Sequence, residues 1–286
     1  MDLPADSHVH TEWSWDARKV GSMDATCARA VEIGLPAVAF TEHVDFTPFR
    51  AGFLVQEHGD FVSDGILTAP ELDVDGYFAC VERCRARFPD LVILTGIEVG
   101  QPHLHAREVD ALLAKGTFDR VLGSLHCIPD GDAFAEPWEL IPRYSAADVF
   151  RSYLREIPRV VAGSEAFSAF AHIDYPLRSW PREAAPFDPH DFEDDLRDAL
   201  RALAVGERAL EINTRLPLHP TVLRWWREEG GRAVTFGSDA HMAHLVGHGF
   251  EQAGRVARTH GFTPSSRPEA PWTAPAHAPH GDPGPV

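Results

Sequence analysis

Val92-Ile93-Leu94-Thr95-Gly96-Ile97-Glu98-Val99 has the composition of a buried strand, but it carries one carboxylate near its end. Such a carboxylate is costly unless it is paired or bound to a metal ion. It could also be the partner of a buried arginine. Apolar runs elsewhere in the chain repeat the pattern, because all but one of them end on residues able to bind a metal. These end residues are His8, His10, His43, Glu98, His126, His172, Asp239 and His241, and only the run ending at Asn213 lacks a strong ligand.

The order of elements along the chain predicts a barrel. Seven strands are expected at 3–8, 37–41, 92–99, 120–126, 168–173, 209–213 and 233–237. Helical periodicity lies between and after them, at 24–33, 77–88, 107–114, 146–161, 191–205, 221–229 and 245–260. This strict alternation favours a parallel (β/α) barrel over a sandwich. The carboxyl ends of barrel strands meet at one rim, where the scattered end residues would converge.

The composition is typical of one large globular domain. The chain has 286 residues, of which 44% are hydrophobic and 24% are charged. We expect a domain over residues 1–262 and a disordered tail over 263–286, rich in Pro, Ala and His. With no candidate membrane span or export signal, a cytoplasmic protein, monomeric or homodimeric, is expected.

The net charge and the cysteines argue against some kinds of ligand and site. The formal net charge is −17, which argues against binding to long nucleic acids. The four cysteines, Cys27, Cys80, Cys84 and Cys127, form no CxxC pair. We interpret them as reduced thiols in the core rather than as disulfides or metal ligands.

Two motifs suggest shared metal ions. His8 and His10 alternate along a strand, so both imidazoles face one side. Gly237-Ser238-Asp239-Ala240-His241 places a carboxylate and an imidazole two residues apart. Each histidine taken singly could be an ordinary core residue, and the argument depends on the repetition at many strand ends.

These two motifs resemble those of the PHP (polymerase and histidinol phosphatase) superfamily. The resemblance includes three further segments, Thr41-Glu42-His43, Gly123-Ser124-Leu125-His126 and Ala171-His172-Ile173-Asp174. The chain is most similar to its histidinol-phosphate phosphatase branch, because Asp16 in Ser14-Trp15-Asp16 stands where some other branches carry a histidine. The resemblance extends over about residues 5 to 250 and implies a distorted (β/α)7, TIM-like barrel with three metals at the C-terminal rim of its strands.

The resemblance also implies which residues hold each metal. The first ion would be bound by His8, His10, Glu98 and Asp239, and the second by Glu98, His126 and His172. The third would be bound by Asp16, His43 and His241. Because the ligands are nitrogen and oxygen atoms without thiolates, we expect Zn, Mn or Fe.

The expected activity is hydrolysis of a small phosphomonoester, either histidinol phosphate or a similar metabolite. A hydroxide bridging two metals would attack phosphorus, and Asp239 or His241 would give a proton to the leaving oxygen. Arginines on rim loops should bind the phosphate, with Arg178 first and Arg143 and Arg215 as further candidates. Glu57, Asp60 and Asp64, in the long connection over 44–75, could bind an amine of the substrate.

Several alternatives stay open. A PHP nuclease or nucleotide phosphodiesterase and a phosphatase of specialised metabolism use the same metals. An amidohydrolase also places HxH on an early strand, but it typically bridges its metals with a lysine, and no lysine ends a strand here. A binding protein without activity is disfavoured, because all nine ligand positions are filled by competent residues.

Overall fold

A computed structural model describes residues 3–275 of the chain. Seven parallel strands form its main sheet: β1 (Asp6–Val9), β2 (Ala37–Asp45), β6 (Val92–Gly100), β7 (Arg120–Ser124), β10 (Ala169–Phe170), β11 (Ala209–Asn213) and β12 (Ala233–Gly237). Each strand pairs with the next one named. The molecule is therefore the (β/α) barrel that the alternation predicted, in the distorted seven-strand form that the resemblance implied.

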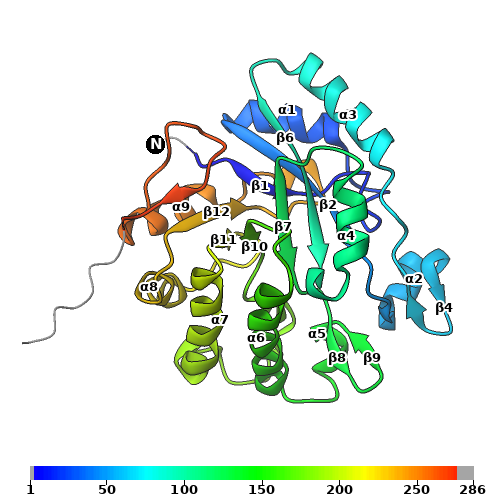
Figure 1. The fold of residues 1–286 in the computed structure, drawn as a ribbon, viewed down its shortest axis with the longest axis vertical. Helices are drawn as coiled ribbons and strands as arrows, with labels where there is room; N and C mark the ends of the chain where they lie inside the picture. The colour runs from blue at the N-terminus through cyan, green and yellow to red at the C-terminus, as the bar shows by residue number, and fades with distance from the viewer. Residues whose placement is uncertain (1–2, 276–286) are drawn as a thin grey trace, which may run out of the picture.

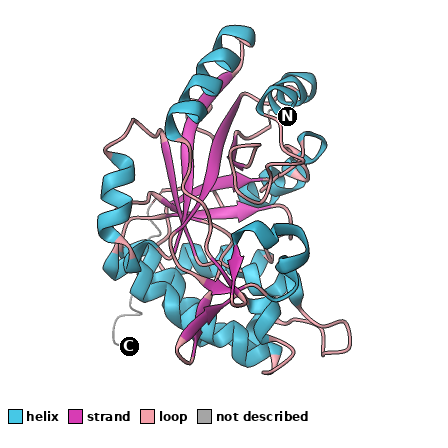
Figure 2. Ribbon diagram, turned by 90° about the vertical axis from the view of Figure 1, so that its right-hand side faces the viewer, coloured by secondary structure: helices cyan, strands magenta, loops and turns pink. Residues whose placement is uncertain are grey.

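Seven helices follow these strands and cover the outside of the barrel (Figures 1 and 2). They are α1 (Met23–Ile33), α3 (Val74–Arg87), α4 (Ala106–Leu113), α6 (Ala146–Gly163), α7 (Glu193–Val205), α8 (Pro220–Glu228) and α9 (Phe250–Thr259). Local sequence sets their ends. The Ser22 side chain accepts a hydrogen bond from the amide of Ala25 at the start of α1, and Gly34, in the left-handed region at φ 74°, ends this helix. No described helix is long and apolar enough to cross a membrane.

The barrel closes where its first and last strands meet. The amide of His10 donates to the carbonyl of Ala240, and the amide of Asp239 donates to the carbonyl of His8. Nearer the start of β12, the short strand β13 (Trp272–Thr273) pairs antiparallel with Ala233 and Val234. Because β11 occupies one edge of β12, β1 and β13 share the other edge.

Strand β13 corrects one expectation. Residues from 263 on were expected to be disordered, but Trp272 is buried against the ring of Phe236 and Thr273 is hydrogen-bonded to Thr263. An aromatic anchor fixes this segment although its composition lacks periodicity. The rest of the expected tail, from residue 276 and including His277 and His280, lies outside the described residues.

Three long connections leave the rim of the barrel. The first contains β3 (Phe49–Arg50), α2 (Val55–His58), β4 (Val62–Ser63) and β5 (Ile66–Leu67), and the second contains β8 (Ile128–Asp130), β9 (Ala133–Ala135) and α5 (Pro137–Leu140). Figure 1 shows α2 and β4 on the same side of the molecule as β8 and β9. The third contains the 3-10 turns η4 (Tyr175–Ser179) and η5 (Pro189–Phe192). Further 3-10 turns are η1 (Gly52–Leu54), η2 (Gly59–Phe61), η3 (Pro102–Leu104) and η6 (Ala243–Leu245).

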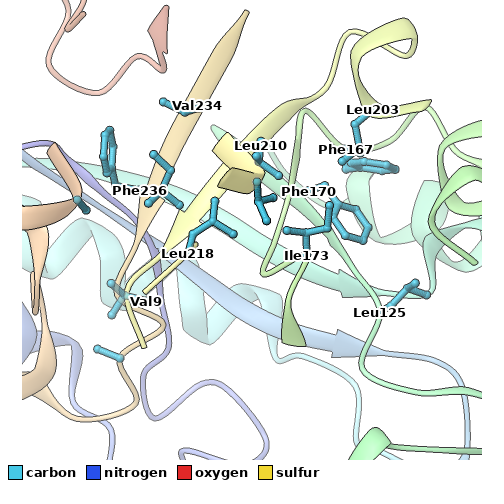
Figure 3. Close-up of a cluster of buried hydrophobic side chains, with 14 of the residues drawn as sticks. Val9, Leu125, Phe167, Phe170, Ile173, Leu203, Leu210, Leu218, Val234 and Phe236 are labelled. Atoms are coloured by element: carbon cyan, nitrogen blue, oxygen red, sulfur yellow. The ribbon is translucent and has the colours of Figure 1, made fainter. Parts of the chain in front are cut away.

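Side chains from separate strands build the core that holds this rim in place. Figure 3 shows Val9 of β1, Phe170 of β10, Leu210 of β11 and Phe236 of β12 in one buried cluster. Cys27, Cys80, Cys84 and Cys127 are all buried and free, which agrees with the interpretation as core thiols.

Candidate metal centre

Glu98 of β6 lies at the centre of the rim and is fully buried. Its Oε2 atom lies 3.2 Å from Nε2 of His8 and 3.4 Å from Nε2 of His10. Its Oε1 atom lies 3.1 Å from Nε2 of His126 and 2.7 Å from Nε2 of His172. Oε2 also lies 3.1 Å from Nδ1 of His43. The two oxygens of one carboxylate therefore face two separate groups of imidazoles.

A third group lies beside the first pair. Asp16, in the turn after β1, places Oδ2 at 2.8 Å from Nε2 of His241 and at 3.4 Å from Nε2 of His43. The rings of His10 and His43 stack with their centroids 4.0 Å apart. The three groups thus form one continuous cluster drawn from six strand ends.

Asp239 joins the cluster from the end of β12. Its Oδ1 atom is 3.4 Å from Nε2 of His10, and its Oδ2 atom accepts a hydrogen bond from Arg178. Asp239 and His172 are non-glycine residues with positive φ, at 53° and 29°. Such conformations cost free energy and persist where surrounding contacts enforce them, as they often do at functional sites. The turn at His172 also explains why β10 ends at Phe170 and not at Ile173 as expected.

Carboxylates that we did not single out from the sequence orient these histidines from behind. Glu211 accepts a hydrogen bond from Nδ1 of His8 at 2.7 Å, and Asp45 accepts one from Nδ1 of His126 at 2.7 Å. These bonds leave Nε2 of each ring free to face the cluster. The signal was present in the sequence, since Asp45 lies two residues beyond His43 and Glu211 two before Asn213, and residues two apart on a strand share a face.

Two glycines make room for these contacts. A Cβ atom at Gly237 would lie 2.6 Å from both His8 Cβ and Glu211 Oε2, and one at Gly100 would collide with Asp45 beside His126. Gly237 accommodates the hydrogen-bonded pair of His8 and Glu211.

The donor atoms fit divalent metal ions. Nε2 of His8 and Nε2 of His10 are 3.0 Å apart, so a single proton or cation has to lie between two lone pairs. Within residues 3–275, Glu98 Oε2 and Asp16 Oδ1 are buried and accept no hydrogen bond. Four overlapping triplets of these side chains bring their ligand atoms within 4.8 Å of one another. We conclude that the cluster is a site for divalent metal ions.

The electrostatics agree with this conclusion. Burial raises the pKa of Glu98, but the imidazoles of His8, His126 and His172 outweigh burial and hold that pKa well below its usual value. Burial lowers the pKa of His126, whereas the charges of Asp45 and Glu98 raise it, to about 10. The cluster therefore attracts positive charge strongly, and a metal ion can satisfy this attraction in place of protons.

A cavity of about 420 Å³ opens over the cluster. Arg178 and Arg215 line it, together with Glu57 from the first long connection and Glu136 from the second. Asp60 and Asp64 are not among its lining residues.

The structure does not bring Arg143 to this cavity. Its guanidinium donates to Asp130 at 2.8 Å and lies over the ring of Tyr144. Because Asp130 lies on the hairpin β8–β9, this ion pair fixes Arg143 to the second connection and away from the metals.

With this geometry in place, comparison with known proteins identifies the family. The sequence pattern of the PHP domain matches residues 6–215. The chain belongs to the PHP domain family. An amidohydrolase typically bridges its metals with a lysine, but no lysine is among the described residues that line this cavity. Glu98 lies between the groups of histidines instead.

Two relatives of this PHP domain protein are named as histidinol-phosphatases. Histidinol-phosphatase of Lactococcus lactis is 29% identical over 90% of this chain and 91% of its own length. Probable histidinol-phosphatase of Clostridium acetobutylicum is 26% identical, over 91% of this chain and 94% of its own.

Solved structures share the fold. Histidinol phosphate phosphatase of L. lactis, complexed with zinc, L-histidinol and phosphate, superimposes with a TM-score of 0.78 at 26% identity and covers 92% of this PHP chain and 95% of its own. A chain from Listeria monocytogenes superimposes with a TM-score of 0.69 at 17% identity, covers 87% of this chain and 99% of its own, and supports the fold alone.

Proposed function

We propose that this protein is a metal-dependent phosphatase that hydrolyses histidinol phosphate to histidinol and phosphate. The observation that carries the proposal is the position of Glu98, whose two oxygens face two different groups of histidines under one cavity. Paired metal sites joined in this way suit the transfer of a phosphoryl group to water. The names of the relatives in L. lactis and C. acetobutylicum support the choice of substrate.

Three metal ions are proposed. His8, His10, Glu98 and Asp239 would hold the first, Glu98, His126 and His172 the second, and Asp16, His43 and His241 the third. Imidazole and carboxylate ligands accommodate Zn, Mn or Fe, and the L. lactis relative is complexed with zinc. When bound, such ions lower the pKa of the attacking water and offset the negative charge of the transferring group.

The residues of the chain bind and orient the phosphate. Arg178 and Arg215 both line the cavity near Asp239, at 2.5 Å and 3.8 Å from its carboxylate oxygens. A guanidinium donates through parallel N–H groups, which match phosphate oxygens. We assign these two arginines to the phosphate.

Asp239 is the better of the two candidates for moving a proton. The Nδ1 atom of His241 donates to the carbonyl of Asp239, and its Nε2 atom faces Asp16, so neither ring nitrogen is free for a leaving group. Asp239 has one oxygen toward His10 and the other toward Arg178 and the cavity. Burial raises the pKa of Asp239, but the charge of Arg178 holds it well below its usual value, so this carboxylate is ionised. We therefore assign to Asp239 a proton relay: it would accept a proton from the attacking water and pass it to the departing alcohol.

Glu136 is positioned to recognise the other end of the substrate. It is buried at the cavity wall, and its Oε2 atom accepts hydrogen bonds from Nε1 of Trp138 at 2.6 Å and from the hydroxyl of Tyr175 at 2.8 Å. The Oε1 atom accepts no hydrogen bond within residues 3–275. A carboxylate held in this way between aromatic rings suits a cationic amine or imidazolium.

Phosphate release after metal reconstitution tests the function. Protein stripped with a chelator and reloaded with Zn²⁺, Mn²⁺ or Fe²⁺ is assayed with histidinol phosphate, and with monoesters lacking a cationic group. We expect Glu98→Gln to lower kcat/KM for histidinol phosphate on the order of a thousandfold with loss of bound metal. Glu71→Gln, which alters an exposed carboxylate, is the matched control. Full activity of Glu98→Gln, or no phosphate release by any reloaded form, would contradict the proposal.

A further inference from the structure

A second, smaller cavity lies next to the metal cavity and plays no part in the proposed reaction. It has a volume of about 200 Å³ and an almost entirely apolar lining. The lining residues come from α6, α7, α8 and the connections after β10 and β11; they include Phe150, Leu177, Trp180, Phe187, Leu196 and Leu216. We refer to it as the apolar cavity.

Aromatic rings form one wall of the apolar cavity. The ring of Phe187 meets Phe150 edge to face with centroids 5.4 Å apart, and it meets Trp180 in the same way at 5.7 Å. Phe187 and Trp180 are partly exposed, so the wall reaches the surface. Flat, apolar ligands pack well against such rings.

One carboxylate lines this space, whose only other polar side chain among the lining residues is that of His219. Asp174 is only 8% exposed, yet within residues 3–275 its carboxylate accepts a hydrogen bond from its own backbone amide and from no other residue. Arg178 acts on it electrostatically, but the guanidinium of Arg178 donates to Asp239 on the metal side. A buried carboxylate with so few hydrogen-bond donors is costly. A ligand that carried a donor and a positive charge would remove this cost.

The same two segments of the chain separate the apolar cavity from the metal cavity. Turn η4 presents Tyr175, Arg178 and Ser179 to the metal cavity, and the same turn presents Leu177 to the apolar cavity. In the connection after β11, Arg215 lines the metal cavity, whereas Leu216 and the residues following it line the apolar one. A ligand in the apolar cavity would therefore contact the back of both arginine-bearing segments.

We propose that the apolar cavity is a separate binding site for a small, flat organic cation, an arylalkylamine or an arylamidine, whose charged group bonds to Asp174 and whose ring packs against Phe187 and Trp180. The combination of aromatic walls and one buried carboxylate, to which no other residue donates, selects this class over neutral aromatics, which supply no positive charge to Asp174, and over anions, which Asp174 repels. This proposed binding site does not depend on which substrate the metal centre hydrolyses.

Benzamidine is a suitable probe, because its planar cation matches a carboxylate and does not ligate metals while protonated. Titration calorimetry on metal-loaded, full-length Glu136→Gln protein, which lacks the cation-binding carboxylate proposed for the metal cavity, is expected to give saturable one-to-one binding. Benzamide, which has the same shape without the charge, should bind at least about tenfold more weakly. Equal binding of the two, or no benzamidine binding at millimolar concentration, would overturn the proposal.

Variants locate the bound probe. Asp174→Asn should weaken benzamidine binding at least about tenfold, and Leu216→Trp, at a half-buried position of the lining, should abolish binding by filling the cavity. Glu136→Gln should leave binding in the apolar cavity in place, because it removes only the carboxylate proposed to bind a cation in the metal cavity. Binding that is lost in Glu136→Gln, or that survives in Leu216→Trp, would contradict the assignment. Since binding is measured without a phosphate ester, the result does not depend on whether the protein is a phosphatase.

Discussion

At the scale of single residues, the metal centre depends on groups that are not themselves proposed ligands. Glu211 and Asp45 accept the Nδ1 protons of His8 and His126, and Ser14 lies 3.1 Å from Nδ1 of His10. Glu42 in turn accepts a hydrogen bond from Ser14. These partners fix the tautomer and the orientation of each ring, which raises the basicity of the nitrogen that faces the metal.

Gly237→Ala tests this dependence without altering any ligand. The added methyl group would displace Glu211 from His8, because both lie 2.6 Å from the position of the new Cβ. We expect metal affinity and kcat to fall by about ten- to a hundredfold. Metal content after dialysis and phosphate release measure the effect.

Gly59→Ala serves as the control for that change, because a Cβ atom at Gly59 meets no atom within 4 Å and its φ is −55°. Equal losses in the two variants, or none in Gly237→Ala, would show that the hydrogen bond between His8 and Glu211 is not required.

At the scale of elements, the sequence predicted the existence of the main strands and helices better than their ends. Strands at 209–213 and 233–237 were predicted to the residue. The expected helix at 245–260 was wrong over its first five residues, because Gly247 and Gly249 adopt positive φ and α9 begins at Phe250. Strand β13 was missed because two residues give no periodic signal, and its pairing with β12 depends on tertiary contacts.

Trp272→Ala measures what β13 contributes. Trp272 is 4% exposed, its ring meets that of Phe236 at 4.8 Å, and Arg258 lies over it at 4.5 Å. Removing a buried tryptophan side chain should lower the free energy of unfolding by about 3–5 kcal/mol, as measured by urea denaturation. Thr273→Ala, at an exposed neighbouring position, should change it by less than about 0.5 kcal/mol. A Trp272→Ala protein as stable as the control would mean that β13 is dispensable.

The thiols between α1 and α3 predict a pH dependence of stability. Burial raises the pKa of Cys84 from 9.0 to about 11. Between these values the folded chain keeps a proton that the unfolded chain has lost, so this group makes stability fall as pH rises from 9 to 11 and has no effect below 9. Under reducing conditions, Cys84→Ala should make the loss of stability over this range smaller by up to about 3 kcal/mol. An unchanged slope in urea denaturation would contradict the interpretation.

At the scale of the whole molecule, the sequence predicted which side chains would meet but not what surrounds them. The convergence of His8, Glu98, His126 and Asp239 followed from one rule, that parallel barrel strands end at one rim. The position of Arg143 could not be predicted, because it depends on how the hairpin β8–β9 folds over the rim and presents Asp130. The partition between the two cavities likewise depends on tertiary packing.

Removal of metal should loosen the entire barrel. The proposed ligands come from the ends of strands and from connections far apart in the chain, and without cations Glu98, Asp16 and Asp239 lie together under the cavity. Ions present at a thousandfold excess over their Kd stabilise the folded state by about 4 kcal/mol, so chelation should lower Tm by about 10 °C. Differential scanning calorimetry before and after chelation checks this, and the effect should shrink in Glu98→Gln. Identical Tm values with and without chelator would contradict it.

The seam at which β1 meets the end of β12 has a consequence for biosynthesis. His8 and His10 leave the ribosome more than two hundred residues before Asp239 and Ala240, which contact them across the seam. Over that stretch of translation the nascent polypeptide carries an incomplete set of the proposed ligands. We therefore expect the centre to take up its full complement of metal only after the last barrel strand has been synthesised.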